Sequence, residues 1–270
     1  MAEPVVFPGF KEKRVLVTGG SSGVGFATAQ ALSASGAVVT LLARNEEPLK
    51  AACEELPGTS HYVVADLTEV AQLKAAVADA VQVMGGLDVL IANGANGGSE
   101  YLGQPAWEPE SFTSLHQIHV NSLVTLAQAA LPELIKSRGN IVSVSSAAAE
   151  TPWPQTTPYN VAKAALNALI HSLAIAHAKH GVRVNGVLPA CIHTPHLDKA
   201  AEKKGVSAEE YASARARSHP LGRVGTAKDV AGAILFLASP AAAFVTGELL
   251  RVDGGLSLTN WFNTQEMMRS

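Results

Sequence analysis

The 270-residue sequence predicts a doubly wound α/β fold: a single parallel sheet of about seven strands with helices on both faces. Short β-branched runs alternate along the chain with longer Ala-rich stretches of helical periodicity. Runs such as Val38–Leu42 are apolar on both faces, as are strands buried inside a parallel sheet. No linker, repeat or shift in composition divides the sequence, so we expect residues 1–270 to form one domain.

Each expected element follows from this alternation. Strands are predicted at Val15–Val17, Val38–Leu42, Tyr62–Val64, Val89–Ile91, Asn140–Val144, Arg183–Val187 and Glu248–Val252. Helices are predicted over about 24–35, 46–55, 69–84, 111–136, 158–180 and 227–238. Residues 191–220 break the rhythm, and both a substrate-binding lid and a solvated pair of surface helices fit them. Residues 256–270 form a tail after the last strand.

Composition excludes several classes of protein. Twenty Lys and Arg against 23 Asp and Glu give a net charge of −3, which argues against a nucleic-acid-binding face. No apolar run approaches the ~18–20 residues of a membrane span, and the N-terminus does not resemble a secretory signal. Two cysteines, Cys53 and Cys191, cannot make a disulfide framework. We therefore expect a cytoplasmic protein without membrane partners.

A glycine-rich turn follows the first predicted strand and opens the first helix. Glycine lets the backbone turn tightly and lets a phosphate approach, while the free N–H groups of the helix attract the anion. The spacing is G-x-x-x-G-x-G, which differs from the usual dinucleotide fingerprint, and an ordinary strand–helix turn is the alternative. At the start of a βαβ chain we favour dinucleotide binding. The candidate residues are Gly19, Ser21, Ser22, Gly23, Val24 and Gly25.

The end of the second strand bears on which dinucleotide binds. An acidic residue there would hold the ribose hydroxyl of NAD, whereas Arg suits the 2′-phosphate of NADP. The sequence offers Arg44 and no carboxylate. A guanidinium can bind a phosphate through two hydrogen bonds, so NADP(H) is favoured and NAD(H) remains possible. The alternative is that Arg44 is a solvated residue at a strand end.

A candidate catalytic group lies between the fifth strand and the following helix. Tyr159 and Lys163 are four residues apart, which places them on one helical face. An ammonium near a phenol would lower the phenol pKa, as an acid–base catalyst needs. Ser146 follows the strand 140–144, where a hydroxyl could polarise a carbonyl oxygen, although it could also be a simple turn residue.

These motifs together resemble the single-domain branch of the short-chain dehydrogenase/reductase family, from about Lys11 to Gly255. The resemblance implies a Rossmann-like fold. The matching residues, in order, are Thr18-Gly19-x3-Gly23-x-Gly25, Asp66, Asn121, Ser146, Tyr159-x3-Lys163, Pro189 to Thr194, Gly222-Arg223-x-Gly225, Asp229 and Val252-Asp253-Gly254-Gly255. Two departures are Ala92-Asn93-Gly94-Ala95, which lacks the first Asn of the family's Asn-Asn-Ala-Gly, and Ala190 in place of a glycine.

The resemblance implies catalytic roles by position. Tyr159 would be the acid–base group, and Ser146 would bind the substrate oxygen. Lys163 would lower the pKa of Tyr159 and bind the nicotinamide ribose. Asn121 would hold a water in a proton relay.

It implies cofactor contacts as well. Asp66 and Leu67 would meet the adenine, Asn93 and Gly94 would allow close approach of the cofactor, and the nicotinamide would meet Pro189, Ile192 and Thr194.

The resemblance thus implies hydride transfer between NADP(H) and a carbonyl or secondary-alcohol substrate. Two alternatives are a non-catalytic NAD(P)-binding sensor or scaffold, and enoyl reduction on the same scaffold. Trp153, Gln155 and His193 are candidate substrate contacts, and no metal site is expected. Family members are often tetramers and sometimes dimers, so a homotetramer or homodimer is expected.

Overall fold

The structure is a computed structural model that describes residues 6–94, 108–153 and 156–259. The main strands are β1 (Arg14–Thr18), β2 (Val38–Ala43), β3 (Ser60–Val64), β4 (Val89–Ala92), β5 (Asn140–Val144), β6 (Arg183–Pro189) and β9 (Leu249–Val252). The helices that cover them are α1 (Gly23–Ala34), α2 (Glu46–Glu54), α3 (Val70–Met84), α5 (Ser122–Ser137), α6 (Thr157–His177) and α9 (Ala227–Ala238). The predicted fold class is confirmed.

All seven main strands are parallel and run in the order β3-β2-β1-β4-β5-β6-β9. The order reverses between β1 and β4, because β2 and β3 extend to one side of β1 and the later strands extend to the other. In sheets of this kind, ligands bind at the carboxyl ends of the strands beside the reversal. The glycine-rich turn after β1 and the segment after β4 both lie at this point.

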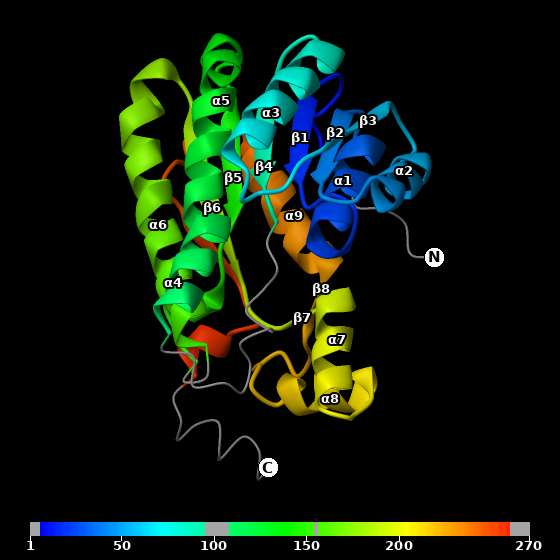
Figure 1. The fold of residues 1–270 in the computed structure, drawn as a ribbon, viewed down its shortest axis with the longest axis vertical. Helices are drawn as coiled ribbons and strands as arrows, with labels where there is room; N and C mark the ends of the chain where they lie inside the picture. Colours follow the sequence, from blue (N-terminus) through cyan, green and yellow to red (C-terminus); the bar gives the residue numbers. More distant parts are fainter. Residues whose placement is uncertain (1–5, 95–107, 154–155, 260–270) are drawn as a thin grey trace.

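Helices cover both faces of the sheet (Figure 1), and an apolar layer packs between the helices and the sheet on each face. One layer joins α1 and α9 to the sheet and includes Leu32 and Ile234, both fully buried. The other joins α3, α5 and α6 to the opposite face and includes Leu73, Leu126 and Ile170. Burying an aliphatic side chain of this size stabilises the fold by roughly 1.5–3 kcal/mol. The carboxyl ends of the strands thus become a rigid platform.

The predicted helix over 111–136 is interrupted. It consists of α4 (Pro109–His116), one π-helical turn (Gln117–Asn121) and α5. The Ser122 hydroxyl donates to the carbonyl of Ile118, and the Thr125 hydroxyl donates to that of Asn121. Such bonds compete with regular helical pairing, and π turns of this kind often occur at functional sites. This turn changes which side chains face the sheet.

Residues 191–220 contain two helices, α7 (Pro195–Lys203) and α8 (Ala208–Ala216), which lie beyond the carboxyl ends of the strands (Figure 1). A short parallel pair, β7 (Ile192–His193) and β8 (Gly225–Thr226), closes the base of this segment. Leu197, Ala201 and Tyr211 form a small buried cluster of their own. The segment is therefore folded, with a core separate from that of the sheet.

Within the described residues, one helix, Thr157–Ala178, is long and apolar enough to cross a membrane by length and composition. Core helices of water-soluble domains pass the same test. This helix buries Asn160, Lys163 and Asn167 against the sheet, and its Ile170 belongs to the core. A third of its most apolar 18-residue window is buried within the described structure.

Candidate active site

A long groove of about 720 Å³ runs across the carboxyl ends of β1, β2 and β4. Gly19 adopts φ +62°, a conformation that side chains disfavour, and α1 begins at Gly23. The N–H groups of the first helical turn therefore face the groove, as an anion site requires. The sequence-predicted residues that line it are Gly19, Ser21, Ser22, Gly23, Val24, Arg44, Asp66, Leu67, Asn93, Gly94 and Thr194.

Gly25 lies beneath the groove instead of in its wall. A Cβ at Gly25 would lie 2.2 Å from the Gly19 carbonyl oxygen and 2.5 Å from the Asn93 side-chain nitrogen. The glycine is therefore needed for the close approach of α1 to the turn before it. Its contribution to binding is to shape the turn.

Asn93 ties β1 to β4 at the reversal point. Its side-chain amide donates to the Thr18 carbonyl at 3.1 Å, and the Thr18 hydroxyl donates to the Asn93 carbonyl at 2.8 Å. The sequence lacks one Asn of the family motif, yet this reciprocal pair braces the central sheet. Rigidity at the reversal point is thus maintained by Asn93 itself.

Arg44 projects into the groove from the end of β2. Its Nη1 lies 3.9 Å from Asp66 Oδ2, and more than half of its side chain is exposed. The amide and hydroxyl of Thr68 both donate to Asp66 Oδ1, and these bonds hold the pKa of Asp66 below its usual value. Lys199 of α7 adds a second cation to the groove wall, and no sequence motif had marked it.

The groove leads into a pocket of about 260 Å³, which shares Val24, Asn93 and Thr194 with it. Ser146 lies just after β5, and Tyr159 and Lys163 lie on α6; all three line this pocket. The side chain of Ser146 acts on the pKa of Tyr159, and its oxygen accepts the Ala148 amide at 3.1 Å. The neighbouring Ser145 points away and bonds to Asn167 at 2.6 Å. The structure thus brings together three of the four residues with predicted catalytic roles.

The pKa values of Tyr159 and Lys163 differ from the sequence-based expectation. Burial raises the pKa of Tyr159, and the hydrogen bond with Ser146 opposes that rise. Burial also lowers the pKa of Lys163 to about 7. Lys163 Nζ donates to the Val144 carbonyl at 3.0 Å and lies 5.6 Å from the Tyr159 ring centre. Desolvation therefore outweighs the predicted charge effect of Lys163 on Tyr159.

Asn121 does not lie in this pocket. Its side chain is exposed, and its amide donates to Gln117 at 2.7 Å within the same helical turn. His119 faces the site in its place, because the π turn rotates the helix there. The His119 ring meets the Tyr159 ring edge-on at 5.4 Å, and its buried Nε2 has no hydrogen-bond partner. Burial, with a smaller effect from Lys163, strongly lowers the pKa of His119.

The remaining predicted residues divide into three groups. Pro189, Ile192 and Trp153 line the pocket, as does Thr194. His193 is exposed, lies 3.3 Å from Asp198 and does not line the pocket. Gln155 lies outside the described residues. In the described part of the chain, no cluster of His, Cys, Asp or Glu could hold a metal ion.

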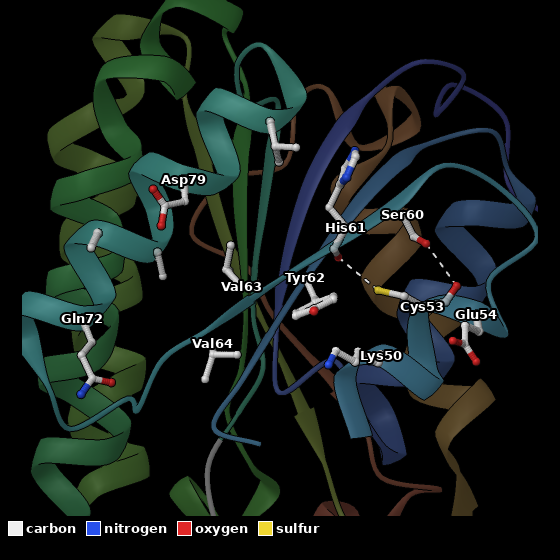
Figure 2. Close-up of a pocket in the computed structure, with 13 residues that line it drawn as sticks. Lys50, Cys53, Glu54, Ser60, His61, Tyr62, Val63, Val64, Gln72 and Asp79 are labelled. Atoms are coloured by element: carbon white, nitrogen blue, oxygen red, sulfur yellow. Dashed lines mark hydrogen bonds between the residues drawn. The ribbon is translucent and has the colours of Figure 1, made fainter. Parts of the chain in front are cut away.

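A second groove, of about 750 Å³, lies at the exposed edge of β3 between α2 and α3 (Figure 2). Lys50, Tyr62 and Asp79 line it, and the Cys53 thiol donates to the His61 carbonyl at 3.3 Å. Burial raises the pKa of that thiol, which disfavours the reactive thiolate. None of the candidate catalytic residues lines this groove, so the larger cavity is not the candidate active site.

The fold and the pocket define an oxidoreductase of the Rossmann type. A family model described as Enoyl-(Acyl carrier protein) reductase matches residues 19–257. The chain belongs to the short-chain dehydrogenase/reductase family.

Sequence relatives include sugar dehydrogenases. L-fucose dehydrogenase of Bos taurus is 34% identical over 91% of this chain and 90% of its own length. L-rhamnose 1-dehydrogenase (NAD(P)(+)) of a Sphingomonas species is 36% identical over 90% of this chain and 96% of its own.

Solved structures with the same fold also match this chain over more than nine-tenths of its length. L-sorbose reductase of Gluconobacter frateurii, complexed with NADPH and L-sorbose, has a TM-score of 0.87 and 28% identity, covering 93% of this chain and 99% of its own. Aldohexose dehydrogenase of Thermoplasma acidophilum, in ligand-free form, has a TM-score of 0.85 and 31% identity, with coverages of 93% and 96%.

Proposed function

We propose that the protein interconverts a carbonyl and a secondary alcohol with NADP(H). The observation that carries this proposal is the joint position of Ser146, Tyr159 and Lys163 at the end of the groove formed by the glycine-rich turn. A hydroxyl and a phenol that meet in one pocket can share the oxygen of a carbonyl group. Hydride transfer explains why this pair opens directly onto a dinucleotide-sized groove.

The residues of this chain supply the proton chemistry. Ser146 orients the substrate oxygen, and the Tyr159 hydroxyl gives that oxygen a proton during reduction or takes it back during oxidation. The raised pKa of Tyr159 keeps the phenol protonated, as reduction requires. Lys163 can exchange a proton near neutral pH because burial lowers its pKa to about 7.

The groove fits a nicotinamide dinucleotide. The turn at Gly19 and Gly23 would hold its phosphates, Asp66 its adenine, and Lys163, Ile192 and Thr194 its nicotinamide end. When bound, the nicotinamide supplies or accepts the hydride. The close packing beneath Gly25 supports this fit, because a side chain there would push the turn into the groove.

The preference for NADP(H) rests on charge. Arg44 lines the groove just after β2, where no acidic residue follows the strand, and Lys199 of α7 lines the same groove. Two cations favour a ribose that carries a phosphate. NADPH and NADH titrated separately into the purified protein test this. NADPH should bind roughly tenfold or more tightly, and tighter binding of NADH would refute the preference.

Carbonyl chemistry is tested against enoyl reduction with matched substrates. Enoyl reduction is the second candidate reaction, because the matching family model is described as Enoyl-(Acyl carrier protein) reductase. The spacing Tyr159-x3-Lys163 favours the carbonyl reaction. The panel comprises small ketones, the sugars named in the relatives, and an α,β-unsaturated thioester, each with NADPH or NADP⁺. Turnover confined to the thioester would replace this proposal with enoyl reduction.

We further propose a homotetramer or homodimer that works in the cytoplasm. Ile175 on α6 and Phe244 after α9 are large apolar side chains with exposures of 82% and 105%. Burial of such side chains between copies would support an oligomer. Both cysteines are free thiols, which supports a reducing compartment. Light scattering coupled to size exclusion measures the oligomeric state, and a monomer at micromolar concentration would refute the first proposal.

A further inference from the structure

Arg215, on α8, is placed at the catalytic pocket in an unusual setting. Its guanidinium carbon lies 5.1 Å from the centre of the Trp153 ring and 5.2 Å from that of Tyr211. Its Nη2 donates to the Tyr211 hydroxyl at 3.0 Å. Contacts with two rings orient the planar guanidinium and restrict its motion. All three side chains line the pocket that contains Ser146 and Tyr159.

Three other arginines are neutralised by carboxylates. Arg14, Arg223 and Arg251 each have a carboxylate oxygen at 2.8 Å or less. Arg215 is held by aromatic rings instead, and the described residues that line its pocket include neither Asp nor Glu. Its positive charge is therefore not balanced by any described residue of the pocket wall.

The charge of Arg215 affects Cys191, which lies at the expected nicotinamide end of the pocket. The Cys191 thiol follows Pro189 and Ala190 at the expected nicotinamide end, and Arg215 opposes the rise that burial causes in its pKa. Electrostatic interactions are stronger in such a partly buried site than in water. An anion in the pocket would thus be attracted to Arg215 while it remained close to Ser146 and Tyr159.

The rest of the wall favours a compact, mainly apolar substrate. Leu197 and Ala200 of α7 present apolar surface, and the volume is only about 260 Å³. The Thr156 hydroxyl in the wall is already bonded to Asn160, whereas His119 Nε2 has no partner. Lys163 also lines the pocket, but it donates to the Val144 carbonyl and burial lowers its pKa to about 7, so Arg215 is the stronger anion-binding group there.

We infer that Arg215, held between Trp153 and Tyr211, binds a carboxylate of the substrate, so that the substrate class is small oxo acids and the corresponding hydroxy acids. This inference rests on the proposed carbonyl–alcohol function. It departs from the sugars named in the relatives, and it assigns residues 191–220 a role in substrate selection. Arg215 provides up to two parallel N–H groups that match the two carboxylate oxygens.

The test compares butyrate with butyramide, which has nearly the same shape and no charge. Each is titrated by calorimetry into the full-length protein saturated with NADP⁺. Butyrate should bind at least tenfold more tightly, since a hydrogen-bonded charge pair contributes roughly 10- to 100-fold. Arg215→Met should abolish this difference, because Met keeps an apolar stem between the rings and removes the charge. Arg217→Met, at an exposed position one residue beyond α8, is the control and should retain it.

Equal binding of the two ligands, binding of neither, or a preference that survives Arg215→Met would overturn the inference. Thermal melting of each variant shows whether it has folded. Turnover separates this inference from the proposed function. Acetoacetate and 4-oxopentanoate are each compared with their methyl esters, using NADPH. Turnover of the esters as fast as the acids would overturn the carboxylate assignment alone. Selective butyrate binding without turnover of any carbonyl would refute the proposed function alone.

Discussion

Gly25→Ala would be the most informative single change in the glycine-rich turn. The added Cβ would lie 2.2 Å from the Gly19 carbonyl oxygen and 2.5 Å from Asn93 Nδ2. Ordinary contacts of this kind begin near 3.4 Å, so these groups must move by about 1 Å. That movement would pull Asn93 away from Thr18, where two hydrogen bonds join β1 to β4.

The expected loss of stability follows from these contacts. Overpacking of a close-packed site costs about 1–3 kcal/mol. Loss of the two hydrogen bonds between Asn93 and Thr18 adds about 0.5–1.5 kcal/mol for each bond. We therefore expect the free energy of unfolding to fall by about 2–6 kcal/mol, which corresponds to a melting temperature lower by roughly 5–20 °C. NADPH affinity should fall by at least about tenfold, because the turn that holds the phosphates is displaced.

Gly232→Ala is the matched control. Gly232 lies within α9, and an added Cβ there meets nothing within 4 Å. Alanine is the better helix former, so this variant should be as stable as the wild type or more stable by about 0.5–1 kcal/mol. Thermal melting and NADPH titration of both variants provide the assay. Wild-type stability and affinity in Gly25→Ala would refute the reasoning.

Three further predictions concern separate parts of the molecule. Arg44→Asp should weaken NADPH binding relative to NADH by roughly 100-fold, and unchanged relative affinities would show that Arg44 does not meet the 2′-phosphate. His119→Phe should lower kcat roughly tenfold with little change in KM, because an aromatic ring remains while the ring nitrogens are lost. His119→Asn should restore part of that rate. Equal kcat in the wild type and both variants would exclude a role of His119 in turnover. Asp88→Asn, which removes the charge that Arg14 binds from both backbone and side chain, should reduce stability by about 2–3 kcal/mol in chemical denaturation at pH 7 without affecting NADPH binding. Burial raises the pKa of Asp88, but bonds from Arg14 outweigh that effect and lower it overall, so the difference between wild type and variant should shrink as the pH falls below about 4, and a constant difference would contradict this assignment.

Much of the fold could be predicted because its signals are local. Strands such as Val38–Ala43 are apolar on both faces, and the turn after β1 contains glycines that other residues cannot replace there. The position of Tyr159 relative to Lys163 follows from helix geometry alone. Their proximity to Ser146 follows from the shared carboxyl edge of a parallel sheet.

The site residues that sequence analysis missed depend on tertiary context. The π turn at Gln117–Asn121 turns His119 inward and leaves Asn121 exposed. No residue pattern in the sequence predicts a π turn at this position. Arg215 is an ordinary charged residue on a short helix until α8 folds over Trp153. Likewise, burial decides the pKa of Tyr159 and Lys163, and burial is known only once the sheet and α6 are assembled.

The central claim is that Tyr159 exchanges a proton with a carbonyl or alcohol oxygen during hydride transfer. The most direct measurement is kcat for the best carbonyl substrate of the panel in Tyr159→Phe, together with NADPH affinity. The account predicts a fall of roughly 10³-fold or more in kcat, with NADPH affinity within about threefold of wild type. A kcat within tenfold of wild type would contradict it.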